Sequence, residues 1–158
     1  MANRRSKENE NTSKTLPVAA VLCGKQPQLT EFMIKNLMPK IEVVHVCTNV
    51  DAAVEEIPAL MKGNTTRPSS GMGTNASGRE RSDISLIIIG GGFSPQDIQA
   101  IKSAADSVKP VAIFCADTSK TPAGAGPPPP DMIKKRMMGG IEKEEKGEGQ
   151  WAPGIYMY

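Results

Sequence analysis

Four short, mainly apolar runs, each ended by glycine, proline or a polar turn, set the pattern of this chain. They cover residues 17–23, 41–47, 85–89 and 110–115. The third run is the clearest, because it contains Ile87-Ile88-Ile89 and then stops at a glycine turn. Continuous β-branched runs of this kind are typical of strands buried on both faces of a parallel sheet. The pattern therefore predicts four strands.

Between these runs, apolar residues recur at helical spacing. A first helix is expected to begin near Pro27 and to end before Pro39, with a buried stripe of Leu29, Phe32, Met33, Leu37 and Met38. A second helix should begin with Thr48 as its cap and Asp51 in its first turn. Pro58 should kink or end that helix, because proline cannot donate the helical hydrogen bond.

The third helix has the strongest start signal in the chain. Ser94 suits the N-cap, Pro95 suits the first helical position, and Asp97 places a carboxylate in the first turn. Beyond the last predicted strand, a short helix is expected over residues 131–138, with Gly139-Gly140 interrupting it.

Strands that alternate with helices predict an α/β fold, here a three-layer structure with a four-stranded parallel sheet and right-handed crossovers. The preferred strand order is 2-1-3-4, which is Rossmann-like or flavodoxin-like. It is preferred because the longest connection falls where the chain must cross from the second strand to the far side of the first. The alternative order is 3-2-1-4. A chain of 158 residues supports one domain with a real core rather than two.

Residues 16–121 form the predicted domain, and the segments outside it differ in composition. Residues 1–15 are polar and are expected to be disordered. The insertion at 63–82 has almost nothing to bury and is expected to be a disordered surface loop. Residues 122–158 are expected to form a flexible extension made of a Pro/Gly-rich linker, the short helix and an aromatic tail with Trp151, Tyr156 and Tyr158.

Composition and charge narrow the classes of partner. A formal net charge of +2 gives no broad basic footprint, so nucleic acid is not an expected partner. No apolar run approaches the length of a membrane span, and the first residues lack the apolar core of a signal peptide. The 3 cysteines do not form a spaced disulfide framework. These features predict a cytoplasmic protein with reduced thiols and no membrane partner.

The candidate ligand site lies where the winding of a 2-1-3-4 sheet reverses. Ligands of such sheets favour the crevice beyond the carboxyl ends of the two strands at that point. Backbone N–H groups, a helix N-terminus and a lysine would meet there and would suit a phosphate or carboxylate. The predicted binding residues are Gly24, Lys25, Gln26, Gly90, Gly91, Gly92, Phe93 and Ser94.

A dinucleotide is a weaker candidate for the same crevice. Gly90-x-Gly92-x-x-Pro95 has proline where the fingerprint requires a third small residue, and it follows the third strand rather than the first. Asp117 and Asp51 lie after strands, where an acid that binds ribose would lie. NAD(P) is therefore retained as a candidate cofactor. A phosphoacceptor receiver is excluded, because glycines and Lys25 occupy the places that its carboxylates need.

Cys23, Cys47 and Cys115 fall near the carboxyl ends of strands, and His45 lies two residues before Cys47 on the same strand face. Cys23 and Cys47 are on neighbouring strands, so a redox pair or a zinc site is conceivable. The chain has no CxxC pair and 1 histidine. We therefore interpret these residues as structural, and predict neither a metal ligand nor a catalytic residue.

Five segments resemble a family of small, mostly uncharacterised fungal Rossmann-like proteins, some of which lie in secondary-metabolite gene clusters. They are Val21-Leu22-Cys23-Gly24-Lys25, Val43-Val44-His45, Glu56-Ile57-Pro58-Ala59-Leu60, Ile89-Gly90-Gly91-Gly92 and Gly154-Ile155-Tyr156. The resemblance implies the fold and a fungal cytosolic context, and it carries over no catalytic residue.

Three functional hypotheses follow. The preferred one is an accessory, non-catalytic protein that binds a small anionic ligand or a partner protein. The second is an enzyme, an oxidoreductase, that uses a nucleotide cofactor in the same crevice. The third is an oligomeric scaffold that pairs through an edge strand or the aromatic tail, which makes a homo-oligomer one of the expected assemblies.

Overall fold

The computed structural model describes residues 17–120, 124 and 128–158. Its centre is a 5-stranded sheet with the order β2-β1-β3-β4-β5. All four neighbouring pairs of strands run parallel. The strands are β1 Val18–Cys23, β2 Ile41–Cys47, β3 Ile84–Ile89, β4 Ala112–Cys115 and β5 Gly154–Met157.

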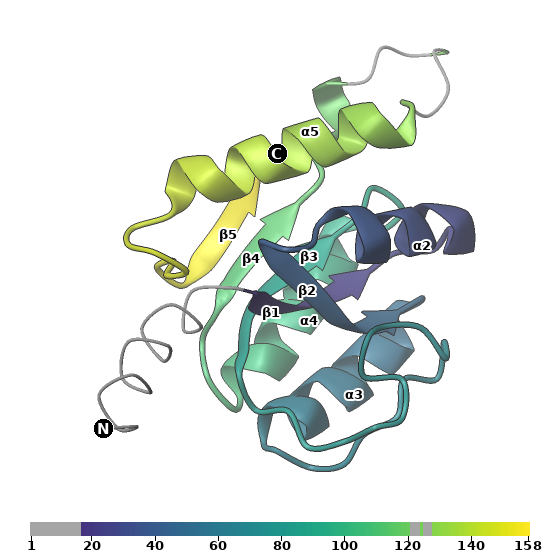
Figure 1. The fold of residues 1–158 in the computed structure, drawn as a ribbon, viewed down its shortest axis with the longest axis vertical. Helices are drawn as coiled ribbons and strands as arrows, with labels where there is room; N and C mark the ends of the chain where they lie inside the picture. The colour runs from purple at the N-terminus through teal and green to yellow at the C-terminus, as the bar shows by residue number, and fades with distance from the viewer. Residues whose placement is uncertain (1–16, 121–123, 125–127) are drawn as a thin grey trace, which may run out of the picture.

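Helices cover both faces of this sheet (Figure 1). On one face, α3 (Val50–Met61) and α4 (Pro95–Asp106) pack over a core that includes Ile57, Ile87 and Ile101. On the other face, α2 (Pro27–Asn36) and α5 (Pro130–Glu144) pack over a core that includes Leu86 and Phe114. The protein is thus a three-layer α/β structure, and the predicted class and the 2-1-3-4 order of the first strands are confirmed.

The prediction of four strands was wrong, because the C-terminal tail supplies a fifth. β5 pairs with β4 in parallel, with Ile113 beside Ile155 and Phe114 beside Tyr156. The rings of Phe114 and Tyr156 stack with their centroids 5.0 Å apart. β5 has only 4 residues, and its side chains are half-buried or exposed. So short an edge strand has no clear hydrophobic pattern in the sequence.

α5 is longer than predicted, because it continues through Gly139 and Gly140 to Glu144. A Cβ added to Gly140 would lie 2.9 Å from the Cβ of Tyr158. Glycine at this position allows the helix and the tail to approach closely, so here it has a packing role and does not end the helix.

Two expectations about α3 also need correction. The helix runs past Pro58 to Met61. Its N-cap is Asn49, whose side chain accepts a hydrogen bond of 2.7 Å from the Ala52 N–H, and not Thr48. By contrast, the predicted start of α4 is confirmed, because Ser94 and Asp97 form a reciprocal capping box.

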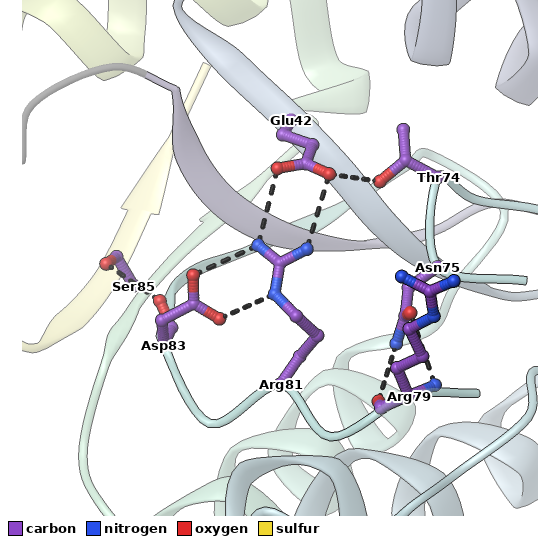
Figure 2. Close-up of polar contacts among 7 residues, drawn as sticks. All are labelled: Glu42, Thr74, Asn75, Arg79, Arg81, Asp83 and Ser85. Atoms are coloured by element: carbon purple, nitrogen blue, oxygen red, sulfur yellow. Dashed lines mark hydrogen bonds and ion pairs between the residues drawn. The ribbon is translucent and has the colours of Figure 1, made fainter. Parts of the chain in front are cut away.

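Residues 63–82, the predicted surface loop, contain no helix or strand and lie along the outer edge of β2. Met72, Thr74 and Asn75 form backbone hydrogen bonds of 2.9–3.2 Å with β2. Arg81 then contacts Glu42 on β2 and Asp83 just before β3 (Figure 2). These contacts cover a strand edge that would otherwise present unpaired N–H and C=O groups.

Two sequence expectations fall on parts of the chain that lie outside the described residues. They are the N-terminal segment 1–15 and most of the Pro/Gly-rich linker. Among the helices of the described residues, none combines the length and the apolar character needed to cross a membrane.

Candidate functional site

A cavity of about 340 Å³ opens at the carboxyl ends of β1, β3 and β4, where the strand order reverses. Such crevices are the usual ligand sites of open parallel sheets, and this volume lies within the common range for small-molecule sites. Its described lining consists of Leu22, Cys23, Gly24, Lys25, Gln26, Leu29, Thr30, Met33, Gly90, Gly91, Gly92, Ala116, Asp117, Thr118, Pro128, Ile133, Arg136, Met137 and Tyr158.

The two glycine turns at the end of β1 and the end of β3 lie side by side. The Gly90 N–H donates a 2.8 Å hydrogen bond to the Cys23 carbonyl, which joins the turns through their backbones. A Cβ on Gly24 would lie 2.7 Å from the Cγ2 of Thr30, so this turn has no room for a side chain.

Two cationic side chains line the cavity from opposite ends of the sequence. Lys25 follows β1 and is exposed, whereas Arg136 comes from α5 and is half-buried. The Lys25 ammonium lies 5.0 Å from the centroid of the Phe93 ring, a cation–π contact that limits where the lysine side chain points. The Arg136 guanidinium donates to Met132 Sδ at 3.8 Å. The cavity thus has two cationic residues in its lining, each with its charged group in contact with a residue outside that lining.

The helix termini at this edge differ in how they accommodate an anion. α2 has no side-chain N-cap and no acidic residue in its first turn. At the start of α4, Ser94 and the Asp97 carboxylate already accept N–H groups. The helix dipole favours negative charge at any N-terminus, and the carboxylate of Asp97 already supplies one at α4. The N-terminus of α2, beside Lys25, is the one better suited to a ligand.

The inner wall of the cavity is apolar. Its largest side chains are Leu22, Leu29, Met33, Ile133 and Met137. Tyr158 is buried there and its phenol donates a 3.2 Å hydrogen bond to the Ile89 carbonyl. Burial raises the pKa of Tyr158 above its ordinary value, so the phenol stays protonated and keeps this hydrogen bond at neutral pH.

The cavity brings together most of the residues predicted from sequence. Gly24, Lys25, Gln26, Gly90, Gly91, Gly92 and Asp117 all belong to its lining. Phe93, Ser94 and Asp51 do not: Phe93 lies beneath the Lys25 ammonium, Ser94 caps α4, and Asp51 lies in the first turn of α3. Asp117 accepts hydrogen bonds from the N–H and the hydroxyl of Ser119, at 3.1 and 2.5 Å.

Arg136 and the other lining residues of the C-terminal extension were not predicted. They are Pro128, Ile133, Arg136, Met137 and Tyr158. The aromatic density of the tail was the one available signal, and it did not show which face of the sheet the preceding helix covers.

Apart from the cavity, a group of polar side chains is buried between β2 and α3. His45 Nε2 lies 2.8 Å from the Glu56 carboxylate, and Cys47 Sγ lies 4.0 Å from the same oxygen. Burial alone would lower the pKa of His45, but hydrogen bonds to Cys47 and Glu56 outweigh it and raise the pKa. The contact with Cys23, together with burial, raises the pKa of the Cys47 thiol far above its usual range.

The fold and the cavity define a class: an α/β protein with a parallel sheet whose order reverses at a small-molecule-sized cavity. Within that class, the chain is similar to "Kojic acid related protein 6" of Aspergillus oryzae. The two are 29% identical over 163 aligned residues, which cover 84% of this chain and 96% of the relative. This similarity supports the resemblance to fungal proteins. No family model matches the chain, and no solved structure matches it.

Proposed function

We propose that this chain is an accessory, non-catalytic protein of the Rossmann-like, flavodoxin-like type that binds a small anionic ligand in the cavity between β1, β3 and α5. The ligand would carry one carboxylate or phosphate group on an apolar body. The observation that carries the proposal is the pairing of Lys25 and Arg136 at a cavity whose inner wall is apolar.

The lining of the cavity supports both parts of this ligand, its anionic group and its apolar body. An ionised group bound between an ammonium and a guanidinium forms charge-assisted hydrogen bonds, which are roughly twice as strong as neutral ones. Leu29, Met33 and Ile133 offer an apolar surface to the rest of the molecule. A ligand with both features would use the whole cavity.

The chemistry of the described lining supports a binding role over catalysis. It contains Asp117 as its one carboxylate and contains no histidine. General acid–base work needs a group with a suitable pKa, positioned at the reacting atom. The Asp117 carboxylate already accepts two hydrogen bonds from Ser119, and we assign no catalytic residue.

An oxidoreductase with a nucleotide cofactor is the second candidate, because Asp117 lies in the lining just after β4. The volume of about 340 Å³ is near the lower end of the range for ligand sites, which favours a molecule smaller than a dinucleotide.

The relative's name supports a proposed setting in fungal secondary metabolism. It also suggests kojic acid as one probe among several, although the name alone assigns no ligand to this chain.

The test is a thermal-shift screen with inorganic phosphate, benzoate, kojic acid, FMN, NADH, NADPH and CoA. A ligand at a hundred times its Kd stabilises the folded state by about 2.7 kcal/mol. We expect an anionic member to raise the Tm of the wild-type chain, and Arg136→Glu to abolish that rise. Lys135→Glu is the matched control, since this exposed neighbour does not line the cavity.

If no probe raises the Tm, or if Arg136→Glu retains the full rise, the proposed site is wrong. A rise with NADH or NADPH alone would favour the second candidate.

A further inference from the structure

His45, Cys47 and Glu56 form a compact buried group on the sheet face opposite α2 and α5. The exposed fraction is 0% for His45, 0% for Cys47 and 9% for Glu56. His45 and Cys47 come from β2 and Glu56 from α3, and the loop at 63–82 covers the strand edge beside them. The ligand cavity does not include any of the three.

The three side chains offer one nitrogen, one sulfur and one oxygen atom, all within 4.8 Å of one another. Around a tetrahedral zinc ion, bonds of about 2.0–2.3 Å place the ligand atoms roughly 3.3–3.8 Å apart. The Nε2–Oε1 distance of 2.8 Å is slightly shorter than this, and the Sγ–Oε1 distance of 4.0 Å is slightly longer. Small side-chain movements would place an ion between the three atoms.

The Glu56 carboxylate is the acceptor that joins this group. Its Oε1 lies 2.8 Å from His45 Nε2 and 4.0 Å from Cys47 Sγ, and the Ser69 N–H lies 3.4 Å from both carboxylate oxygens. The other ring nitrogen, His45 Nδ1, is buried without a hydrogen-bond partner among the described residues, and an ion held through Nε2 leaves it so.

The charges of the group suit a divalent cation. Binding would release the Cys47 thiol proton. A neutral imidazole, a Cys47 thiolate and a Glu56 carboxylate carry two negative charges, which a divalent ion balances; with Cys23 in the fourth position the site would be neutral if Cys23 binds as a thiol and would carry one negative charge if it binds as a thiolate. Thiolate and imidazole ligands select zinc-type metals over Mg²⁺ or Ca²⁺, which prefer oxygen ligands.

A fourth ligand is available on the neighbouring strand. Cys23 is the register partner of Cys47 in the β1–β2 pair, and both side chains belong to the core on the α3 face of the sheet. Its sulfur lies outside the set of three atoms that are all within 4.8 Å of one another. Structural zinc sites are almost always four-coordinate, and Cys23, on the strand beside Cys47, is the residue we assign to the fourth position.

We propose that His45, Cys47 and Glu56 bind a zinc-type divalent ion, with Cys23 in the fourth position. The site holds β2 to α3 and to β1, so its role is structural. The site shares Cys23 with the lining of the cavity, but none of His45, Cys47 and Glu56 lines it, and the proposal does not rest on a ligand in the cavity.

The test uses the full chain, freed of metal with a chelator and titrated with Co²⁺ as a spectroscopic probe, followed by Zn²⁺ competition. We expect one Co²⁺ per chain and a thiolate-to-cobalt charge-transfer band that Zn²⁺ removes. Cys47→Ala should weaken both the band and Co²⁺ binding, and the double variant Cys23→Ala/Cys47→Ala should have no band. Glu56→Gln should weaken Co²⁺ binding by more than the about 10–100-fold typical of a residue outside the ligand set, and Cys23→Ala should weaken it too.

Cys115→Ala is the control, because Cys115 is the third buried cysteine and lies outside the group. It should keep both the band and the affinity. Circular dichroism of each metal-free variant establishes whether it folds. Where Cys47→Ala fails to fold, the wild-type titration still decides: a folded wild-type chain without a saturable charge-transfer band overturns the site. A band that Cys115→Ala removes overturns it as well, and unchanged affinity in Cys23→Ala overturns the fourth ligand.

Discussion

Gly139 and Gly140 are neighbours in α5 with opposite surroundings. A Cβ on Gly140 would lie 2.9 Å from the Tyr158 Cβ, whereas a Cβ on Gly139 would meet nothing within 4 Å. Gly140→Ala should therefore lower the free energy of unfolding by about 1–3 kcal/mol through overpacking. Gly139→Ala should raise it by about 0.5–1 kcal/mol, because alanine is the better helix former.

Urea unfolding of both variants measures these changes. Equal effects of the two substitutions would show that α5 does not pack against the tail as described.

The Tyr158 hydroxyl gives a second prediction at this scale. Tyr158→Phe removes a buried hydrogen bond of 3.2 Å to the Ile89 carbonyl. The same carbonyl also accepts a hydrogen bond from the Ala116 N–H, so it keeps a partner. We expect a loss of about 0.5–1.5 kcal/mol in the free energy of unfolding.

Tyr156→Phe is the matched control for that measurement. Its hydroxyl donates to the Ala152 carbonyl at 2.8 Å from a half-buried side chain. Tyr156→Phe should lower the free energy of unfolding by less than Tyr158→Phe, since water can bind the Ala152 carbonyl once the hydroxyl is removed. If Tyr156→Phe lowered the free energy of unfolding more than Tyr158→Phe, the burial of the Tyr158 side chain would be contradicted.

Sequence alone could predict the residues of the site that follow strands. Gly24, Lys25 and Gly90 were found because glycine turns after buried strands indicate where a parallel sheet binds ligands. Arg136 and Glu56 could not be found in this way. Each lies on a helix, and its neighbours depend on which sheet face that helix covers.

Arg81 connects the covering loop to the sheet (Figure 2). Its guanidinium lies 3.3 Å from the Glu42 carboxylate and 3.0 Å from that of Asp83. Burial would raise the pKa of Glu42, but hydrogen bonds from Arg81 and Thr74 outweigh it and lower the pKa. A hydrogen bond from Arg81 also lowers the pKa of Asp83.

These lowered pKa values fix the sign of a pH dependence. Carboxyl groups with a lower pKa in the folded state stabilise it above their unfolded pKa, which is about 4. That contribution disappears as the pH falls through the folded pKa values. Arg81→Gln should therefore destabilise the protein by about 1 kcal/mol or less near pH 7, because ion pairs that water still reaches contribute little, and by still less below about pH 4.

The measurement is the free energy of unfolding of wild type and variant across this pH range. Lys102→Gln is the control, since it removes an ion pair within α4 that does not touch the loop. A difference between wild type and Arg81→Gln that grows toward acid pH would contradict the role assigned to Arg81.

At the scale of elements, the first four strands and the start of α4 were predictable because their signals are local. A buried run of isoleucines and a Ser-Pro-x-Asp start need no knowledge of the rest of the fold. β5 and the full length of α5 were not predictable, because their pattern is completed only by contact with β4 and Tyr158. The edge contacts of the 63–82 loop are made largely by its backbone, which hydrophobic patterning does not report.

For the whole molecule, the reversal of strand order and the C-terminal extension together produce the cavity. The reversal places the turns after β1 and β3 side by side. α5 and the end of the chain add Arg136 and Tyr158 to the lining that Lys25 shares. The cavity thus depends on residues from both ends of the described chain.

The proposed anion site is tested most directly by locating bound probes on the protein. Amide resonances in ¹⁵N–¹H correlation spectra would be followed while inorganic phosphate, benzoate, kojic acid, FMN, NADH, NADPH and CoA are added in turn. Gly24, Gly91 and Gly92 report on the cavity, and Gly71, in the loop beside β2, is the control.

The account predicts saturable shifts at the three cavity glycines with an anionic probe, little change at Gly71, and loss of the shifts in Arg136→Glu. It would be contradicted if every probe left the cavity glycines unmoved, or if the shifts were the same in Arg136→Glu as in the wild-type chain.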